Sequence, residues 1–251
     1  MKSVWSKVKQ RVVEINTGGF EVFEATRQAM DEVMNALNDD KVTAVGVYGM
    51  GGVGKTIMVE HVCQQAQNDG LFDHVIMVVV TQRPDLRKIQ GILADQLGVE
   101  LEETTLIKIQ GTFADQLAIK LEESTQSRRA ARLSMEIMRR NKILIILDDI
   151  WERIDLSRIG IPSYKELQNC NSKVLLTTRI RKVRHVMRCQ EKITLSTLSE
   201  EDSWALFVRN AGRFSESTKV EDVARKVARE CAGLPIAVIN AWWNGKKQLN
   251  D

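Results

Sequence analysis

The stretch GMGGVGKT at residues 49–56 decides how this sequence is read. It fits the pattern G-x-x-x-x-G-K-[ST], in which glycines let the backbone wrap around a phosphate so that successive N–H groups point at it. The apolar run 42–48 precedes it, and a helical pattern from about Lys55 to Gln67 follows it. An ordinary glycine-rich turn is the alternative, but a strand before and a helix after favour a phosphate-binding loop.

Each position of this loop has a chemical task. Lys55 is expected to bridge β- and γ-phosphates as a catalytic cation, and Thr56 to ligate Mg²⁺. The nucleotide-binding residues predicted in the loop are Gly49, Gly51, Gly52, Val53, Gly54, Lys55 and Thr56.

Apolar, β-branched runs alternate with helical stretches between residues 42 and 195, which is typical of βαβ units. The predicted strands are 42–48, 74–80, 142–147, 173–178 and 192–195. Because the second and third runs are continuously apolar, helices should cover both faces of a parallel sheet in a three-layer α/β fold. After residue 196 the pattern is helical only. We therefore expect a lead-in at 1–41, a P-loop domain at 42–195 and a small helical cap at 196–251.

Composition limits the other classes of function. The 251 residues include 36 basic and 33 acidic side chains, and a net charge of +3 is too small to indicate a nucleic-acid partner. No apolar run reaches the roughly 20 residues of a membrane helix. The three histidines lack the spacing of a zinc site. The four cysteines form no C-x-x-C pair and no apolar leader opens the chain, so we expect a reducing, cytoplasmic location.

Charged residues follow two of the predicted strands. Asp148 and Asp149 end the run 142–147, at the sheet edge where open α/β folds bind ligands. Asp148 should hold Mg²⁺, and Asp149 should orient or deprotonate an attacking water, with a helix cap or turn as its alternative role. Arg179 follows the strand 173–178 and could sense a γ-phosphate if that strand adjoins the loop strand. The basic residues at 181–188 are interpreted as the solvated face of an amphipathic helix.

The segment KIQGILADQL at 88–97 recurs as KIQGTFADQL at 108–117, and LEE at 101–103 recurs at 121–123. Two copies offset by 20 residues are too few for a solenoid, so a local duplication within 88–123 is the better interpretation. Each copy has apolar residues at helical spacing, so the extra unit can form a surface helix, and it is assigned no catalytic role.

Five motifs in order resemble the NB-ARC domain of plant disease-resistance proteins of the coiled-coil type, over roughly residues 20–240. They are GVYGMGGVGKT at 46–56, LIILDDIW at 144–151, KVLLTTR at 173–179, LSEEDSWALF at 198–207 and CAGLP at 231–235.

The resemblance implies a P-loop NTPase of the STAND class that rests with ADP, is active with ATP, and hydrolyses ATP weakly. Asp148 then matches the magnesium aspartate, Asp149 the catalytic acid, Arg179 the γ-phosphate sensor and Pro235 the proline against the adenine. It also implies that the strand 173–178 lies between the loop strand and the Asp148 strand. Protein partners in immune signalling follow from the same resemblance.

The sequence also departs from the family. Ile57 stands where the family usually has a second threonine, and the 20-residue repeat looks like an insertion. The helical continuation after Pro235 gives way to AWWNGKKQLND at 241–251, without the usual winged-helix element, so we expect a truncated switch core. A conventional P-loop ATPase or small-molecule kinase, and a signalling-inert decoy, are the competing functions.

Overall fold

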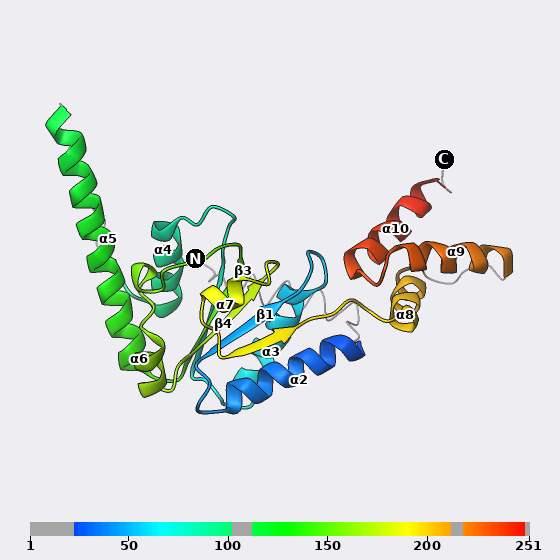
Figure 1. Ribbon diagram of the computed structural model, residues 1–251, viewed down its shortest axis with the longest axis horizontal. Helices are drawn as coiled ribbons and strands as arrows, with labels where there is room; N and C mark the ends of the chain where they lie inside the picture. Colours follow the sequence, from blue (N-terminus) through cyan, green and yellow to red (C-terminus); the bar gives the residue numbers. More distant parts are fainter. Residues whose placement is uncertain (1–22, 102–111, 212–217, 249–251) are drawn as a thin grey trace.

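The fold is built on a parallel five-stranded sheet in the order β2-β3-β4-β1-β5 (Figure 1). The computed structural model describes residues 23–101, 112–211 and 218–248. The strands are β1 (Ala44–Tyr48), β2 (His74–Val79), β3 (Ile143–Ile150), β4 (Lys173–Thr178) and β5 (Glu191–Thr194). All five predicted strands are therefore present, and β4 lies between β1 and β3 as the resemblance implied.

Helices cover both faces of the sheet. They are α2 (Glu24–Asn38), α3 (Lys55–Asn68), α4 (Leu86–Leu97), α5 (Thr112–Arg140), α6 (Tyr164–Asn169) and α7 (Val183–Val186), with a 3₁₀ turn η1 (Ser157–Ile159). One core cluster contains residues of α2 and α3, and the other contains residues of α4, α5, η1, α6 and α7. The three-layer α/β fold is thus confirmed.

Strand β3 shows why its apolar run is continuous. Ile143, Ile145 and Leu147 belong to one core cluster, whereas Leu144 and Ile146 belong to the other. Side chains alternate between the two faces of a strand, so an apolar residue is needed at every position when both faces are covered.

Strand β3 is longer than predicted and contains the two acids. It runs to Ile150, and its pairing with β4 is irregular between Leu147 and Ile150. Asp149 lies in this irregular part with a φ of 60°, a left-handed conformation that Asp tolerates better than most residues. The sequence pattern ended the strand at Leu147 because it followed apolar residues only.

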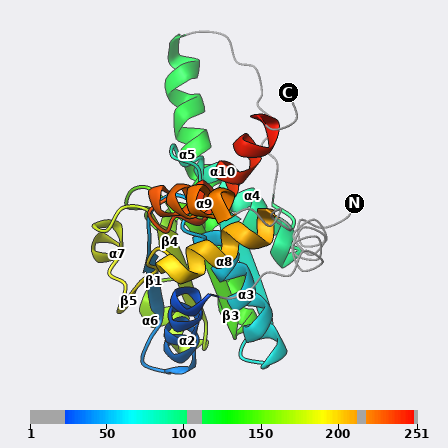
Figure 2. The same cartoon turned by 90° about the vertical axis from the view of Figure 1, so that its right-hand side faces the viewer.

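Three further helices, called the cap below, pack against one another: α8 (Glu200–Ala211), α9 (Thr218–Glu230) and α10 (Pro235–Gln248). Phe207, Ala224, Ala228 and Val238 form its core cluster. Ser199 caps the start of α8, because its hydroxyl accepts the Asp202 N–H at 3.0 Å. Figures 1 and 2 show the cap at one end of the molecule, opposite the long helix α5. The division at residue 196 stays a prediction.

The interpretation of residues 181–188 as a solvated face is wrong for one residue. Arg184 is only 3% exposed, and its Nη1 donates a hydrogen bond to the Ile193 carbonyl at 2.7 Å. Its guanidinium lies 5.2 Å from the ring centre of Tyr48. A basic residue in a charged run can thus be buried when a neighbouring strand offers it a carbonyl and a ring face.

The repeat has a structural role in its first copy. Ile89, Leu93 and Leu97 lie on α4 and are buried in the sheet core, so this helix is part of the domain rather than an addition to its surface. The second copy begins in residues outside the described part and continues into α5. Among the described residues no helix is long and apolar enough to cross a membrane.

Candidate functional site

The loop between β1 and α3 has the backbone that a phosphate site requires. Gly52 and Gly54 have φ values of 81° and 101°, which side chains with a Cβ rarely adopt. Gly54 is also the residue directly before α3. The N–H groups of Gly52, Gly54, Lys55 and Thr56 donate to no other described residue. These unused donors surround the N-terminus of a helix, where its dipole favours an anion.

Lys55 reaches back over its own loop. Its Nζ donates to the carbonyl oxygens of Gly49 at 2.7 Å and Met50 at 2.9 Å, and the residue is 6% exposed. Burial lowers the pKa of Lys55, and Arg179 lowers it further, whereas Asp149 and Asp148 raise it. A buried ammonium that depends on two carbonyls is poised to exchange them for a stronger anionic acceptor.

Asp148 is oriented by two hydroxyl groups. The Thr56 Oγ1 donates to Asp148 Oδ2 at 2.7 Å, and the Thr177 Oγ1 donates to Asp148 Oδ1 at 2.5 Å. The Asp148 residue is 2% exposed. The structure therefore brings together the two predicted metal ligands, Thr56 of α3 and Asp148 of β3. Both offer oxygen atoms, which Mg²⁺ prefers.

Asp149 and Arg179 form a two-point ion pair. Arg179 Nε donates to Asp149 Oδ1 at 2.8 Å, and Arg179 Nη2 donates to Asp149 Oδ2 at 3.1 Å. The indole Nε1 of Trp151 donates to the same Oδ2 at 3.2 Å. The Asp149 side chain thus accepts hydrogen bonds from an arginine and an indole. Its hydrogen bonds to the described residues do not include a helix cap.

Arg179 also lies against the phosphate loop. A Cβ placed on Gly51 would stand 3.1 Å from Arg179 Nη1, so the guanidinium occupies the space beside that glycine. This contact depends on the strand order, because Arg179 directly follows β4, which runs between the loop strand and the strand of the acids.

Pro235 reaches the site through its neighbour in the cap. It is half-buried at the first position of α10, and the next residue, Ile236, donates its N–H to the Gly52 carbonyl at 3.4 Å. Leu234 packs against the core cluster beneath the loop. The cap therefore borders the phosphate loop directly.

Two residues of this site were missed by sequence reasoning. Thr177 accepts the Asp149 N–H at 2.9 Å while it donates to Asp148, and it was treated only as part of a strand. Trp151 was quoted in a motif without a role. Their positions in the sequence could have identified them, because each lies within two residues of a predicted site residue, at the same edge of the sheet.

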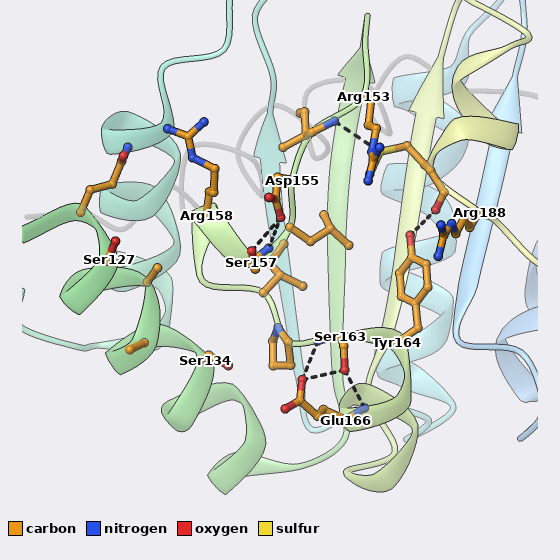
Figure 3. A pocket seen from close by; sticks show the side chains of 18 of the residues that line it. Ser127, Ser134, Arg153, Asp155, Ser157, Arg158, Ser163, Tyr164, Glu166 and Arg188 are labelled. Carbon is orange, nitrogen blue, oxygen red and sulfur yellow. Dashed lines mark hydrogen bonds between the residues drawn. The ribbon is translucent and has the colours of Figure 1, made fainter. Parts of the chain in front are cut away.

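A separate cavity of about 730 Å³ lies between α5, η1, α6 and α7 (Figure 3). The two acids on its wall are used locally, since Asp155 accepts from Ser157 and Glu166 accepts from Ser163. None of the predicted site residues lines it.

The sheet order, the loop and the two acids at its edge define a P-loop NTPase fold. Domain III of the replication initiation protein DnaA from Thermotoga maritima has a TM-score of 0.51 at 13% identity, over 88% of this chain and 82% of that one. AMPPCP-bound DnaA from Aquifex aeolicus has a TM-score of 0.50 at 15% identity, over 92% of this chain and 62% of that one. At these identities the likeness concerns the fold alone.

Sequence comparison identifies the family. The NB-ARC domain model matches residues 26–217, and the Arabidopsis thaliana disease resistance protein At4g27190 is 34% identical over 223 residues. That match covers 87% of this chain and 20% of the relative. The chain belongs to the NB-ARC family of nucleotide-binding domains, as its motifs predicted. It spans about a fifth to a quarter of the length of the curated relatives it matches.

Proposed function

We propose that this chain binds ADP or ATP with Mg²⁺ and works as a nucleotide-dependent switch core in plant defence. The observation that carries the proposal is the contact between Thr56 Oγ1 and Asp148 Oδ2 at 2.7 Å. It places a phosphate loop and a buried carboxylate, 92 residues apart in sequence, at one point on the sheet edge. The disease-resistance relatives and the AMPPCP-bound neighbour support the same proposal.

The loop fits a phosphate chain. Its unused N–H groups offer donors, and the backbone is accessible at Gly54, since nothing lies within 4 Å of a Cβ placed on that residue. Lys55 would transfer its Nζ donors from the two loop carbonyls to phosphate oxygens. The pair of Thr56 and Asp148 would hold Mg²⁺, the first directly and the second directly or through water.

The residues near a terminal phosphate favour slow hydrolysis. The bound triphosphate would supply the phosphoanhydride bond that water cleaves. Asp149 would accept a proton from that water at a carboxylate oxygen, but both of its oxygens already accept from Arg179. The ion pair therefore weakens Asp149 as a base until it opens, which suits a switch better than a rapid ATPase.

The cap supplies the remaining parts of the proposal. Pro235 would lie against the adenine, in keeping with the family, and the contact of Ile236 with Gly52 would transmit a change in the loop to the helices α8 to α10. An ADP-bound resting state, an ATP-bound active state, protein partners in immune signalling and a cytoplasmic location belong to this proposal.

Isothermal titration calorimetry tests it. The parent chain should bind ADP and a non-hydrolysable ATP analogue, and Mg²⁺ should strengthen the binding of the ATP analogue. The variant Asp148→Asn should lose most of that Mg²⁺ effect, whereas Asp155→Asn, at the separate cavity, should keep it. A parent chain that binds neither nucleotide, or an unchanged Mg²⁺ effect in Asp148→Asn, would contradict the proposal.

A further inference from the structure

Trp151 is a large aromatic residue that packs into none of the three hydrophobic clusters of the described residues. It follows directly after β3 and is half-buried. Its indole contacts two charged groups of the site. The indole Nε1 donates to Asp149 Oδ2 at 3.2 Å, and the Arg179 guanidinium carbon lies 5.2 Å from the centre of the ring.

The contacts use both chemical properties of an indole. Its N–H is a hydrogen-bond donor, which suits the carboxylate, and its electron-rich face attracts a cation. Trp151 thus favours the arrangement in which Asp149 and Arg179 face each other. A leucine would offer neither contact, and a phenylalanine would keep only the ring face.

The ends of β3 and β4 hold these groups in place. The Thr178 Oγ1 donates to the Ile150 carbonyl at 2.6 Å and accepts the Ile180 N–H at 3.0 Å. This hydroxyl joins the residue before Trp151 to the strand end that carries Arg179. The triad of Trp151, Asp149 and Arg179 is therefore a defined unit rather than a chance surface contact.

The guanidinium of Arg179 is divided between two directions. Its Nε and Nη2 donate to Asp149, whereas Nη1 faces the loop at Gly51. A two-point contact with a terminal phosphate needs one full edge of the guanidinium, and the Nε edge is occupied by Asp149. Pairing with Asp149 and two-point pairing with a phosphate through this edge exclude each other.

We infer that Trp151 is a positioning residue that holds Arg179 on Asp149 and thereby sets how readily Arg179 turns to a terminal phosphate. This inference rests on the proposed nucleotide binding and extends it to the regulation of the same site. In the paired state Asp149 is neutralised and the Nε edge of Arg179 is occupied. In the released state this edge of Arg179 contacts the phosphate, and Asp149 no longer accepts from Arg179. Trp151 stabilises the paired state alone, so it favours the diphosphate over the triphosphate.

The first test compares nucleotide preference in graded variants. The ratio of the affinity for a non-hydrolysable ATP analogue to that for ADP is measured by calorimetry in the parent, Trp151→Phe and Trp151→Leu. The ratio should rise roughly threefold in Trp151→Phe, which loses the N–H, and roughly tenfold in Trp151→Leu, which also loses the ring face. Trp204→Phe, in the cap, should leave it unchanged. If Trp151→Leu fails to fold, Trp151→Phe still gives the result.

The second test needs no nucleotide. The indole N–H signal of Trp151 in a ¹H–¹⁵N NMR spectrum is identified as the one missing in Trp151→Phe. This signal should shift in Arg179→Met. The matched control is Arg225→Met, which removes the guanidinium that lies 4.3 Å from the ring centre of Trp204, and it should shift the Trp204 signal alone.

The outcomes separate this inference from the proposed function. A Trp151 signal that ignores Arg179→Met would overturn the triad. Nucleotide binding by the parent with the same preference in both Trp151 variants would overturn the inference alone. A parent chain that binds no nucleotide would overturn the proposed function, and the inference with it.

Discussion

Replacement of Gly52 by alanine should separate the cap from the phosphate loop. Gly52 has a φ of 81°, and a left-handed conformation costs a residue with a Cβ about 1–2 kcal/mol. The new Cβ would also stand 2.3 Å from Ile236 Cγ2, a distance that real contacts do not reach. Overpacking of this kind costs about 1–3 kcal/mol, although the half-exposed Ile236 can relax. We expect Gly52→Ala to lower the free energy of unfolding by about 2–4 kcal/mol.

Gly54→Ala is the matched control for this prediction. Its φ of 101° carries a similar backbone cost, but nothing lies within 4 Å of the added Cβ. Urea denaturation followed by circular dichroism should therefore show a loss of only about 1–2 kcal/mol for this variant. The difference between the two variants measures the clash with the cap.

A second substitution tests the origin of the difference. Ile236→Ala removes the Cγ2 atom, and Gly52→Ala combined with Ile236→Ala should recover about 1 kcal/mol relative to Gly52→Ala alone. Equal stability of Gly52→Ala and Gly54→Ala, or a double variant without recovery, would refute the contact between α10 and the loop.

Four further predictions concern single residues. Lys55→Ala should weaken ADP binding roughly 10- to 100-fold in a folded chain, measured by calorimetry against the exposed control Lys165→Ala. Asp149→Asn should slow single-turnover ATP hydrolysis without a comparable loss of ATP binding; equal rates would leave water activation unassigned. Hydrogen bonds from two neighbouring arginines lower the pKa of Glu136 to about 2. The ionised Glu136 should therefore contribute about 1 kcal/mol to the free energy of unfolding above pH ~4.5, and this contribution should disappear as the pH falls toward 2. Acid denaturation of Glu136→Gln should lack this pH-dependent component. Cys231 is the one half-buried cysteine among four, so Ellman's reagent should modify it first in the native chain, and a Cys231→Ser chain that reacts as fast would contradict this.

The sequence predicted the fold well because its strongest signals are spaced regularly. The five apolar runs marked the strands to within three residues, and the loop motif fixed which end of the sheet holds the site. What it missed depends on contacts between distant segments. Arg184 is buried where it contacts the Ile193 carbonyl and the Tyr48 ring, and nothing in a run of basic residues shows this.

The same limit applies to the site. The acids and Arg179 were predicted from their positions after strands, but the ion pair between Asp149 and Arg179 depends on β4 lying beside β3. That adjacency came from the family resemblance and not from the spacing. The irregular end of β3, with Asp149 at positive φ, has no sequence signal beyond the tolerance of Asp for that conformation.

The connection from β2 to β3 contains the sequence repeat, and its length bears on how the domain tolerates insertions. About 60 residues separate Val79 from Ile143, and about 40 would remain without one copy. Loop-closure entropy grows only with the logarithm of length, so the extra copy raises the entropic cost of joining these neighbouring strands by about 0.4 kcal/mol. Such a cost is small beside the stability of a domain. A crossover that leaves and rejoins the sheet at adjacent strands is therefore a place where the gene can gain a further helical segment while the phosphate loop and its acids keep their positions.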